Sequence, residues 1–105
     1  MSYDLFIEPE VHALRHTLPG KLRQRVRLAI AQLATEPRPH ESRPMNANDL
    51  NMRPDVELRR IRLERWRIIY AVCEAERWVW VLAIRRCPPY GYDDLAELIA
   101  RLPPP

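Results

Sequence analysis

Three successive runs in the second half of the chain are rich in apolar, β-branched and aromatic residues. The runs are Val56–Leu63, Trp66–Cys73 and Trp78–Arg86, and their composition predicts strands. The short links between them, Glu64-Arg65 and residues 74–77, predict two hairpins and so a three-stranded antiparallel meander. Because Glu64-Arg65 is poorly suited to a primed two-residue turn, we expect that turn to be longer or bulged.

Helical spacing dominates the first half. After a short strand candidate over residues 3–8, Val11, Leu14 and Leu18 recur at i, i+3 and i+7. Pro19-Gly20 breaks the chain, and a second apolar stripe follows within residues 21–34, made by Leu22, Val26, Ala29, Ile30 and Leu33. These two stripes predict a helical hairpin.

The remaining segments are a long loop and a final helix. Residues 35–55 contain four prolines and show no period, so we expect a loop, which Met45, Leu50 and Met52 could anchor to the core. A last apolar stripe, Leu95, Leu98, Ile99 and Leu102, predicts a helix capped by Asp93 or Asp94. The predicted order β-α-α-β-β-β-α, with helices and strands segregated, indicates an α+β fold.

Composition and the lack of targeting signals limit the domain number and the cellular location that we expect for this protein. A chain of 105 residues with 47% hydrophobic content predicts a single domain over residues 1–105. The two cysteines, Cys73 and Cys87, have no metal or redox-motif spacing, which is typical of a reducing compartment. The N-terminal residues do not resemble a signal peptide, and the longest apolar run, residues 78–84, is too short to span a bilayer. We therefore expect a cytoplasmic protein without a membrane partner.

Arginine dominates the basic residues, and much of it clusters. Lysine and arginine total 17 for a net charge of +3, and only Lys21 is a lysine. Arg60 and Arg62 project from one face of the first strand of the meander. Arg67 lies at the start of the second strand, and Arg85 and Arg86 lie at the end of the third. Antiparallel pairing would gather these groups at one end of the sheet. Guanidinium groups match phosphate oxygens in pairs, so the cluster predicts a polyanion site, most simply for RNA. The structural alternative is surface arginines paired with Glu57, Glu64, Asp93 and Asp94.

Other candidate residues carry weaker signals. Tyr90 and Tyr92 follow the cluster and could stack on bases or transfer protons, or pack in the core or a loop. His12 and His16 are spaced as a metal pair on the first helix, but no third ligand is in register. We therefore predict no metal site and no cofactor.

The stretches Glu57-Leu-Arg-Arg-Ile-Arg-Leu, Trp66-Arg-Ile-Ile-Tyr and Leu82-Ala-Ile-Arg-Arg resemble the RelE/ParE superfamily of bacterial toxins. The resemblance covers nearly the whole chain. It implies a three- or four-stranded antiparallel sheet, with the helical hairpin packed on one face, a short C-terminal helix, and residues 3–8 as the added strand.

The resemblance is nearest the RelE-like branch, whose members cut mRNA on the ribosome and are neutralised by a cognate antitoxin. It implies that Arg60 and Arg62 contact RNA, that Arg67 holds the scissile phosphate, that Arg86 acts near the leaving group and that Tyr92 lies against the substrate. Arg85 and Tyr90 are alternatives to Arg86 and Tyr92, and we count both as RNA-binding candidates. The expected reaction is attack of a 2′-OH on the adjacent phosphate, without a metal.

The sequence departs from RelE at two positions, since RelE has lysines where this chain has Arg60 and Arg62. A guanidinium group stays protonated and is a poor general base. No histidine lies in the cluster, so we expect cleavage to depend on the ribosome. The alternatives are a ParE-like inhibitor of DNA gyrase, a catalytically silent binder of RNA or antitoxin, and an interaction module that grips an acidic protein.

Overall fold

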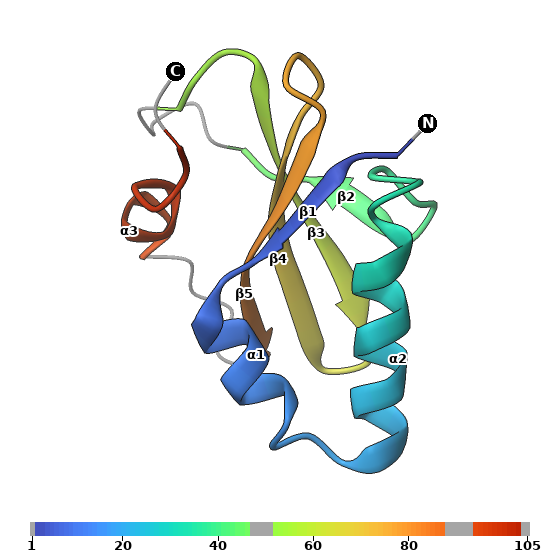
Figure 1. Ribbon diagram of the computed structural model, residues 1–105. Helices are drawn as coiled ribbons and strands as arrows, with labels where there is room; N and C mark the ends of the chain where they lie inside the picture. Colours follow the sequence, from blue (N-terminus) through green and yellow to red (C-terminus); the bar gives the residue numbers. More distant parts are fainter. Residues whose placement is uncertain (1, 47–51, 88–93, 104–105) are drawn as a thin grey trace.

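The computed structural model describes residues 2–46, 52–87 and 94–103. Figure 1 shows a curved sheet flanked by helices. The elements in chain order are β1 (Asp4–Ile7), α1 (Pro9–Arg15), α2 (Gly20–Gln32), β2 (Ser42–Pro44), β3 (Val56–Leu63), β4 (Trp66–Cys73), β5 (Trp78–Arg86) and α3 (Leu95–Ile99). The α+β class, the helical hairpin and the three long strands are confirmed at their predicted positions.

The sheet has five strands in the order β1-β5-β4-β3-β2, whereas three or four were predicted. The added strand is β2, which pairs antiparallel with β3 inside the segment that we predicted to be a loop. Three residues ending in Pro44 show no alternation, and a proline is tolerated because the strand lies at the edge of the sheet. The sheet is also not wholly antiparallel, because β1 pairs parallel with β5.

The hairpin between β3 and β4 corrects a second expectation. Leu63 pairs with Trp66, so Glu64 and Arg65 form a two-residue turn rather than a longer or bulged one. Glu64 adopts a φ of 54°, the left-handed conformation that such a turn demands. The side chain of Glu64 also accepts a hydrogen bond from Arg25 of α2 at 3.0 Å, which joins this turn to the helix.

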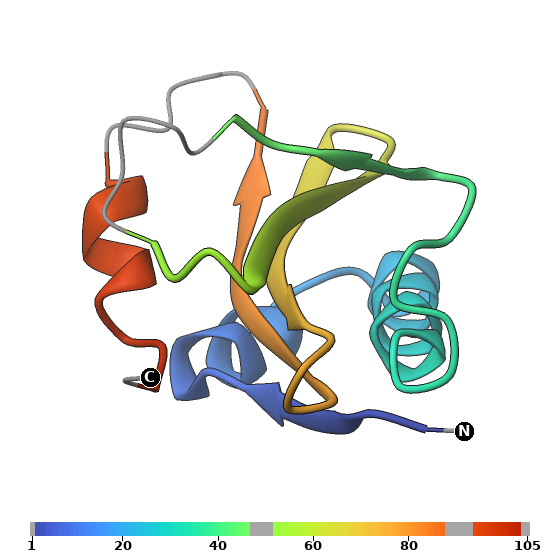
Figure 2. The same ribbon diagram turned by 90° about the horizontal axis from the view of Figure 1, so that it is seen from above.

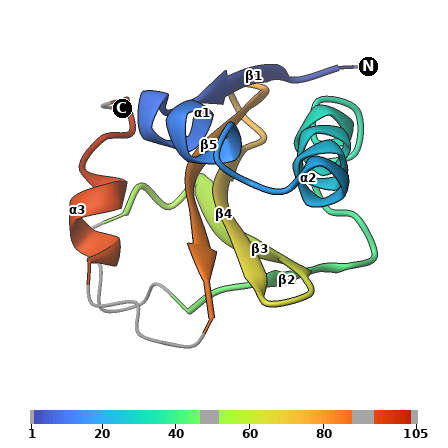
Figure 3. The ribbon, with the colours of Figure 1, turned by 90° about the horizontal axis from the view of Figure 1, so that it is seen from below.

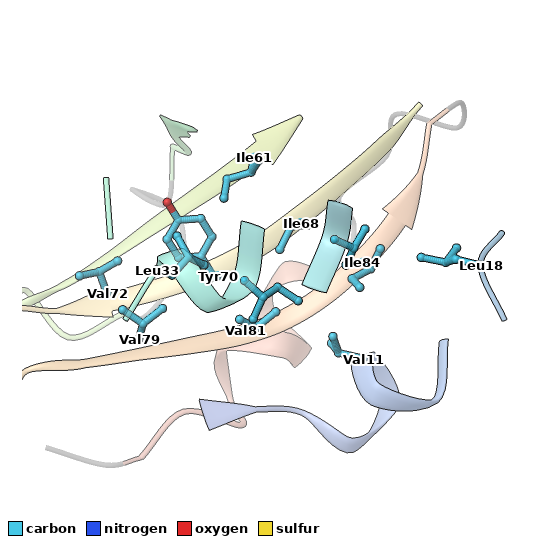
Figure 4. Packing of buried hydrophobic residues seen from close by; sticks show 12 residues of the cluster. Val11, Leu18, Leu33, Ile61, Ile68, Tyr70, Val72, Val79, Val81 and Ile84 are labelled. Atoms are coloured by element: carbon cyan, nitrogen blue, oxygen red, sulfur yellow. The ribbon is translucent and has the colours of Figure 1, made fainter. Parts of the chain in front are cut away.

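Two hydrophobic layers cover the two faces of the sheet, and α2 and α3 lie on opposite sides of it (Figure 3). The first layer joins α1 and α2 to alternate residues of the central strands, and Figure 4 shows Ile68, Tyr70 and Val81 packed within it. The second layer joins α3 to Leu58, Ile69 and Leu82, among others. Strand β4 is therefore buried on both faces from Arg67 to Cys73.

The proline-rich loop and the last helix follow the predictions in part. Met45 and Met52 pack against the second layer, as expected, whereas Leu50 lies outside the described residues. Figure 2 shows α3 standing at the side of the sheet, away from α2. Asp94 occupies the N-cap position of α3 but makes no capping hydrogen bond, and Asp93 lies outside the described residues. None of the described helices is long and apolar enough to cross a membrane.

Candidate functional site

The strand register sets three of the predicted arginines in one row across the sheet. Arg62 of β3 pairs with Arg67 of β4, and Arg67 pairs with Arg85 of β5. Arg60 projects from the same face as Arg62 because the two are separated by one residue. This face is the one that α3 covers further along the sheet. Four of the predicted site residues thus share one face at the β3–β4 hairpin end.

A β-bulge decides which of the two arginines at the end of β5 joins this face. Ile69 pairs with Ala83 whereas Tyr70 pairs with Val81, so Leu82 is an extra residue in β5. After the bulge, Ile84 packs with the α2 layer, and alternation sets Arg85 on the opposite face beside Arg67. Arg86 then falls on the α2 side, where it is exposed and pairs with Trp66. The structure therefore brings Arg85, rather than Arg86, to the face that carries Arg67.

Strand β2 brings two further residues that the sequence did not single out. Arg43 pairs with Arg60, and extending the register by one residue sets Glu41 opposite Arg62. Five residues line a hollow of about 300 Å³ at this corner of the sheet: Glu41, Arg43, Arg60, Arg62 and Arg67. We call it the arginine hollow. No sequence pattern marks Glu41 and Arg43, because residues 41–43 are all polar and do not alternate.

Arg67 is the most buried member of the arginine hollow, with 8% of its surface exposed. Its Nη1 donates to the backbone carbonyls of Glu64 and Trp66, at 3.2 and 3.1 Å, and these bonds hold it at the hairpin. Among the described residues, Arg60, Arg62 and Arg67 form no ion pair. A buried guanidinium group without a carboxylate is costly in the free protein and is ready to accept an anion.

Arg85 differs from the other arginines of this face because a carboxylate neutralises it. Its guanidinium group forms an ion pair with Asp94 at the start of α3. The hydrogen bond from Arg85 lowers the pKa of the Asp94 carboxyl below its ordinary value. The alternative of arginines paired with acidic residues thus holds for Arg85, whereas Glu57 and Glu64 pair with arginines outside the hollow.

A buried polar network on the opposite face fixes β2 in place. Ser42 is 2% exposed and Arg59 is 9% exposed. Arg59 donates to the Ser42 hydroxyl from Nε and Nη2, at 3.1 and 2.7 Å, and Ser42 donates to the carbonyl of Pro39 at 2.8 Å. Tyr70 donates to the carbonyl of Pro37 at 2.7 Å, and burial raises the pKa of this phenol. Because side chains alternate, anchoring Ser42 on this face directs Glu41 and Arg43 to the other.

Replacing Ser42 with alanine should lower the free energy of unfolding by about 1–3 kcal/mol, because two buried Arg59 donors lose their acceptor. Urea unfolding followed by circular dichroism would measure the change. Thr17→Ala is the matched control, since it removes an exposed hydroxyl that bonds to the carbonyl of Leu14, and it should change stability by less than about 0.5 kcal/mol. Equal losses in the two variants would contradict the anchoring role of Ser42.

The remaining candidates lie elsewhere or cannot be placed. Tyr90 and Tyr92 lie outside the described residues. The Nδ1 atom of His12 lies 3.1 Å from Nη2 of Arg15, a contact on the outer surface of α1. No group of three or more His, Cys, Asp or Glu side chains within residues 2–46, 52–87 and 94–103 could hold a metal ion. Cys73 and Cys87 are buried free thiols.

The arrangement of the sheet and helices is similar to that of several solved structures. The chain is similar to RelE in the archaeal RelE–RelB complex from Pyrococcus horikoshii OT3, with a TM-score of 0.70 and 25% identity over 82% of this chain and 96% of that one. The chain has the RelE fold. The isolated RelE toxin of E. coli matches this RelE fold with a TM-score of 0.59 and 18% identity, over 95% of this chain and 98% of that one.

A third similar structure is the RelBE2 toxin–antitoxin complex from Mycobacterium tuberculosis, with a TM-score of 0.60 and 18% identity over 83% of this chain and 100% of that one. These similarities confirm the resemblance to the RelE/ParE superfamily, on its RelE-like side. At the level of sequence, no protein-family model and no curated protein matches the chain.

Proposed function

We propose that this protein is the toxin of a type II toxin–antitoxin system and that it cleaves mRNA on the ribosome. The observation that carries the proposal is the arginine hollow, in which Arg67 is buried among three further guanidinium groups and pairs with no carboxylate of residues 2–46, 52–87 and 94–103. The described lining residues supply four cations and one carboxylate, that of Glu41, and so make a strongly positive, open surface. Such a surface suits a phosphodiester backbone better than a neutral ligand.

The proposed reaction uses the 2′-OH of the substrate to attack the adjacent phosphate, so the chemistry requires no metal ion. Negative charge grows on the non-bridging phosphate oxygens in the transition state. Fixed guanidinium groups that are already in position stabilise this charge without reorganising, which is often the largest contribution to catalysis. Arg67 is the best-placed of them because two backbone carbonyls fix its orientation.

The other residues enter the proposal through the resemblance and through their placement. Arg60 and Arg62 extend the positive surface along the RNA, and Arg43 adds to it from β2. Arg85 lies in the same row as Arg67, while Arg86 would reach the substrate from the other face. Tyr92 is proposed for proton transfer and Tyr90 for contact with a base.

The proposed partners are an antitoxin, the ribosome and its message. The similar structures from P. horikoshii and M. tuberculosis are toxin–antitoxin complexes, which supports a cognate antitoxin for this chain. The proposed place of action is the cytoplasm, because translating ribosomes are found there.

Cleavage of a defined mRNA on purified 70S ribosomes tests the proposal. Antitoxin-free protein should cut the message bound in the decoding site and leave the same RNA intact in the absence of ribosomes. An intact message in both reactions, with protein that still binds its antitoxin, would refute the nuclease function. Inhibition of gyrase supercoiling by the same preparation would then indicate a ParE-like target.

A further inference from the structure

Among the described residues that line the arginine hollow, one carries a side chain of the chemical type that can act as a base. A guanidinium group is a poor general base because it holds its proton, which sets aside the four arginines among the five described lining residues. The fifth is Glu41, at the residue that precedes β2. A reaction that begins by removing a proton from a 2′-OH needs such an acceptor close to the phosphate-binding cations.

The strand register places Glu41 in the same row as the phosphate-binding candidate. The row starts at Glu41, the residue before β2, and continues through Arg62 of β3, Arg67 of β4 and Arg85 of β5. Neighbouring strands are about 4.8 Å apart, so Glu41 and Arg67 are separated by two strand spacings. A phosphate held between these side chains would have its adjacent 2′-OH within reach of a glutamate.

Glu41 also lacks the structural role that would otherwise explain a carboxylate among arginines. Glu57, Glu64 and Glu74 each form an ion pair within 3.0 Å, whereas Glu41 forms none with the described residues. It is exposed, so a bound substrate can reach it. Its backbone is held by the neighbouring Ser42, which is buried and bonded to Arg59.

We propose that Glu41 is the general base of the cleavage reaction, an assignment that rests on the proposed nuclease function. The carboxylate removes the proton of the 2′-OH, and the 2′ oxygen forms a bond to phosphorus. The bond between phosphorus and the 5′ oxygen of the next nucleotide breaks, and that oxygen takes a proton from water. The products are a 2′,3′-cyclic phosphate and a 5′-OH, and Arg62 and Arg67 stabilise the charge on the phosphate oxygens.

The test compares Glu41→Gln with wild type in single-turnover cleavage of mRNA on programmed ribosomes. Removal of a general base should slow cleavage by about 10²–10⁴-fold. Binding to ribosomes that carry a message with a 2′-deoxy nucleotide at the cleaved position should not weaken, because a negative charge is lost. Glu36→Gln is the matched control, since Glu36 is an exposed glutamate of the same loop, and it should cleave at the wild-type rate.

A second variant separates a chemical role from a structural one. Glu41→Gly should be as slow as Glu41→Gln, and added formate should restore part of its rate by supplying a carboxylate in the space left open. Rapid cleavage by Glu41→Gln, or loss of ribosome binding together with cleavage, would overturn the assignment while the nuclease function stood. Absence of cleavage by wild type would instead refute the nuclease function itself.

Discussion

Replacing Arg67 with alanine should reduce the rate of single-turnover mRNA cleavage on programmed ribosomes by about 10²–10³-fold. The guanidinium group is buried and held by two backbone carbonyls, so it contacts the phosphate without rearranging. Alanine removes this preorganised charge, and the water that enters the space stabilises the negative charge on the phosphate less well than the guanidinium group does. Arg67→Lys should recover only part of the rate, because an ammonium group binds one oxygen as a point charge and cannot match two in a plane.

The matched control is Arg23→Ala, which removes an exposed arginine from α2, the helix that packs on the face of the sheet opposite to the hollow. It should cleave at close to the wild-type rate, and both variants should keep the wild-type circular dichroism spectrum. An Arg67→Ala protein that folds and cleaves as fast as Arg23→Ala would remove Arg67 from the proposed site. A fall that is equal in both variants would indicate a general electrostatic effect of net charge.

Replacing Ile68 with alanine should lower the free energy of unfolding by about 2–5 kcal/mol. Ile68 has none of its surface exposed and packs in the layer between α2 and the sheet (Figure 4). Arg67 and Ile69 lie on the opposite side of β4. The substitution removes three carbons from a layer in which helices and strands interlock, and the cavity that remains adds to the cost. Urea unfolding monitored by tryptophan fluorescence would measure the loss.

Leu28→Ala is the control for this prediction, because Leu28 lies on α2 with 50% of its surface exposed. It should change stability by less than about 0.5 kcal/mol. Comparable losses in the two variants would show that the layer between α2 and the sheet is not the main core. A large loss for Ile68→Ala alone would support the packing described for this layer.

The sequence by itself determined the elements whose patterns are long. Segments of eight or nine residues with recurring apolar side chains specify β3, β4 and β5, and apolar stripes spaced by three and four residues specify α1 and α2. The same reasoning placed Arg60, Arg62 and Arg67 at one end of the sheet, because alternation and hairpin pairing are local rules. These rules act between neighbours in the chain and can therefore be applied to a sequence alone.

Only the tertiary structure decided the parts of the site that depend on distant contacts. Strand β2 exists because Arg59 and β3 supply its hydrogen-bond partners from outside the loop, and it brings Glu41 and Arg43 to the hollow. The bulge at Leu82 decides between Arg85 and Arg86, since unbroken alternation from Trp80 would set Arg86 on the face of Arg67. One extra residue in a strand exchanges the two faces for every residue after it, and packing against β4 rather than local propensity fixes where that residue lies.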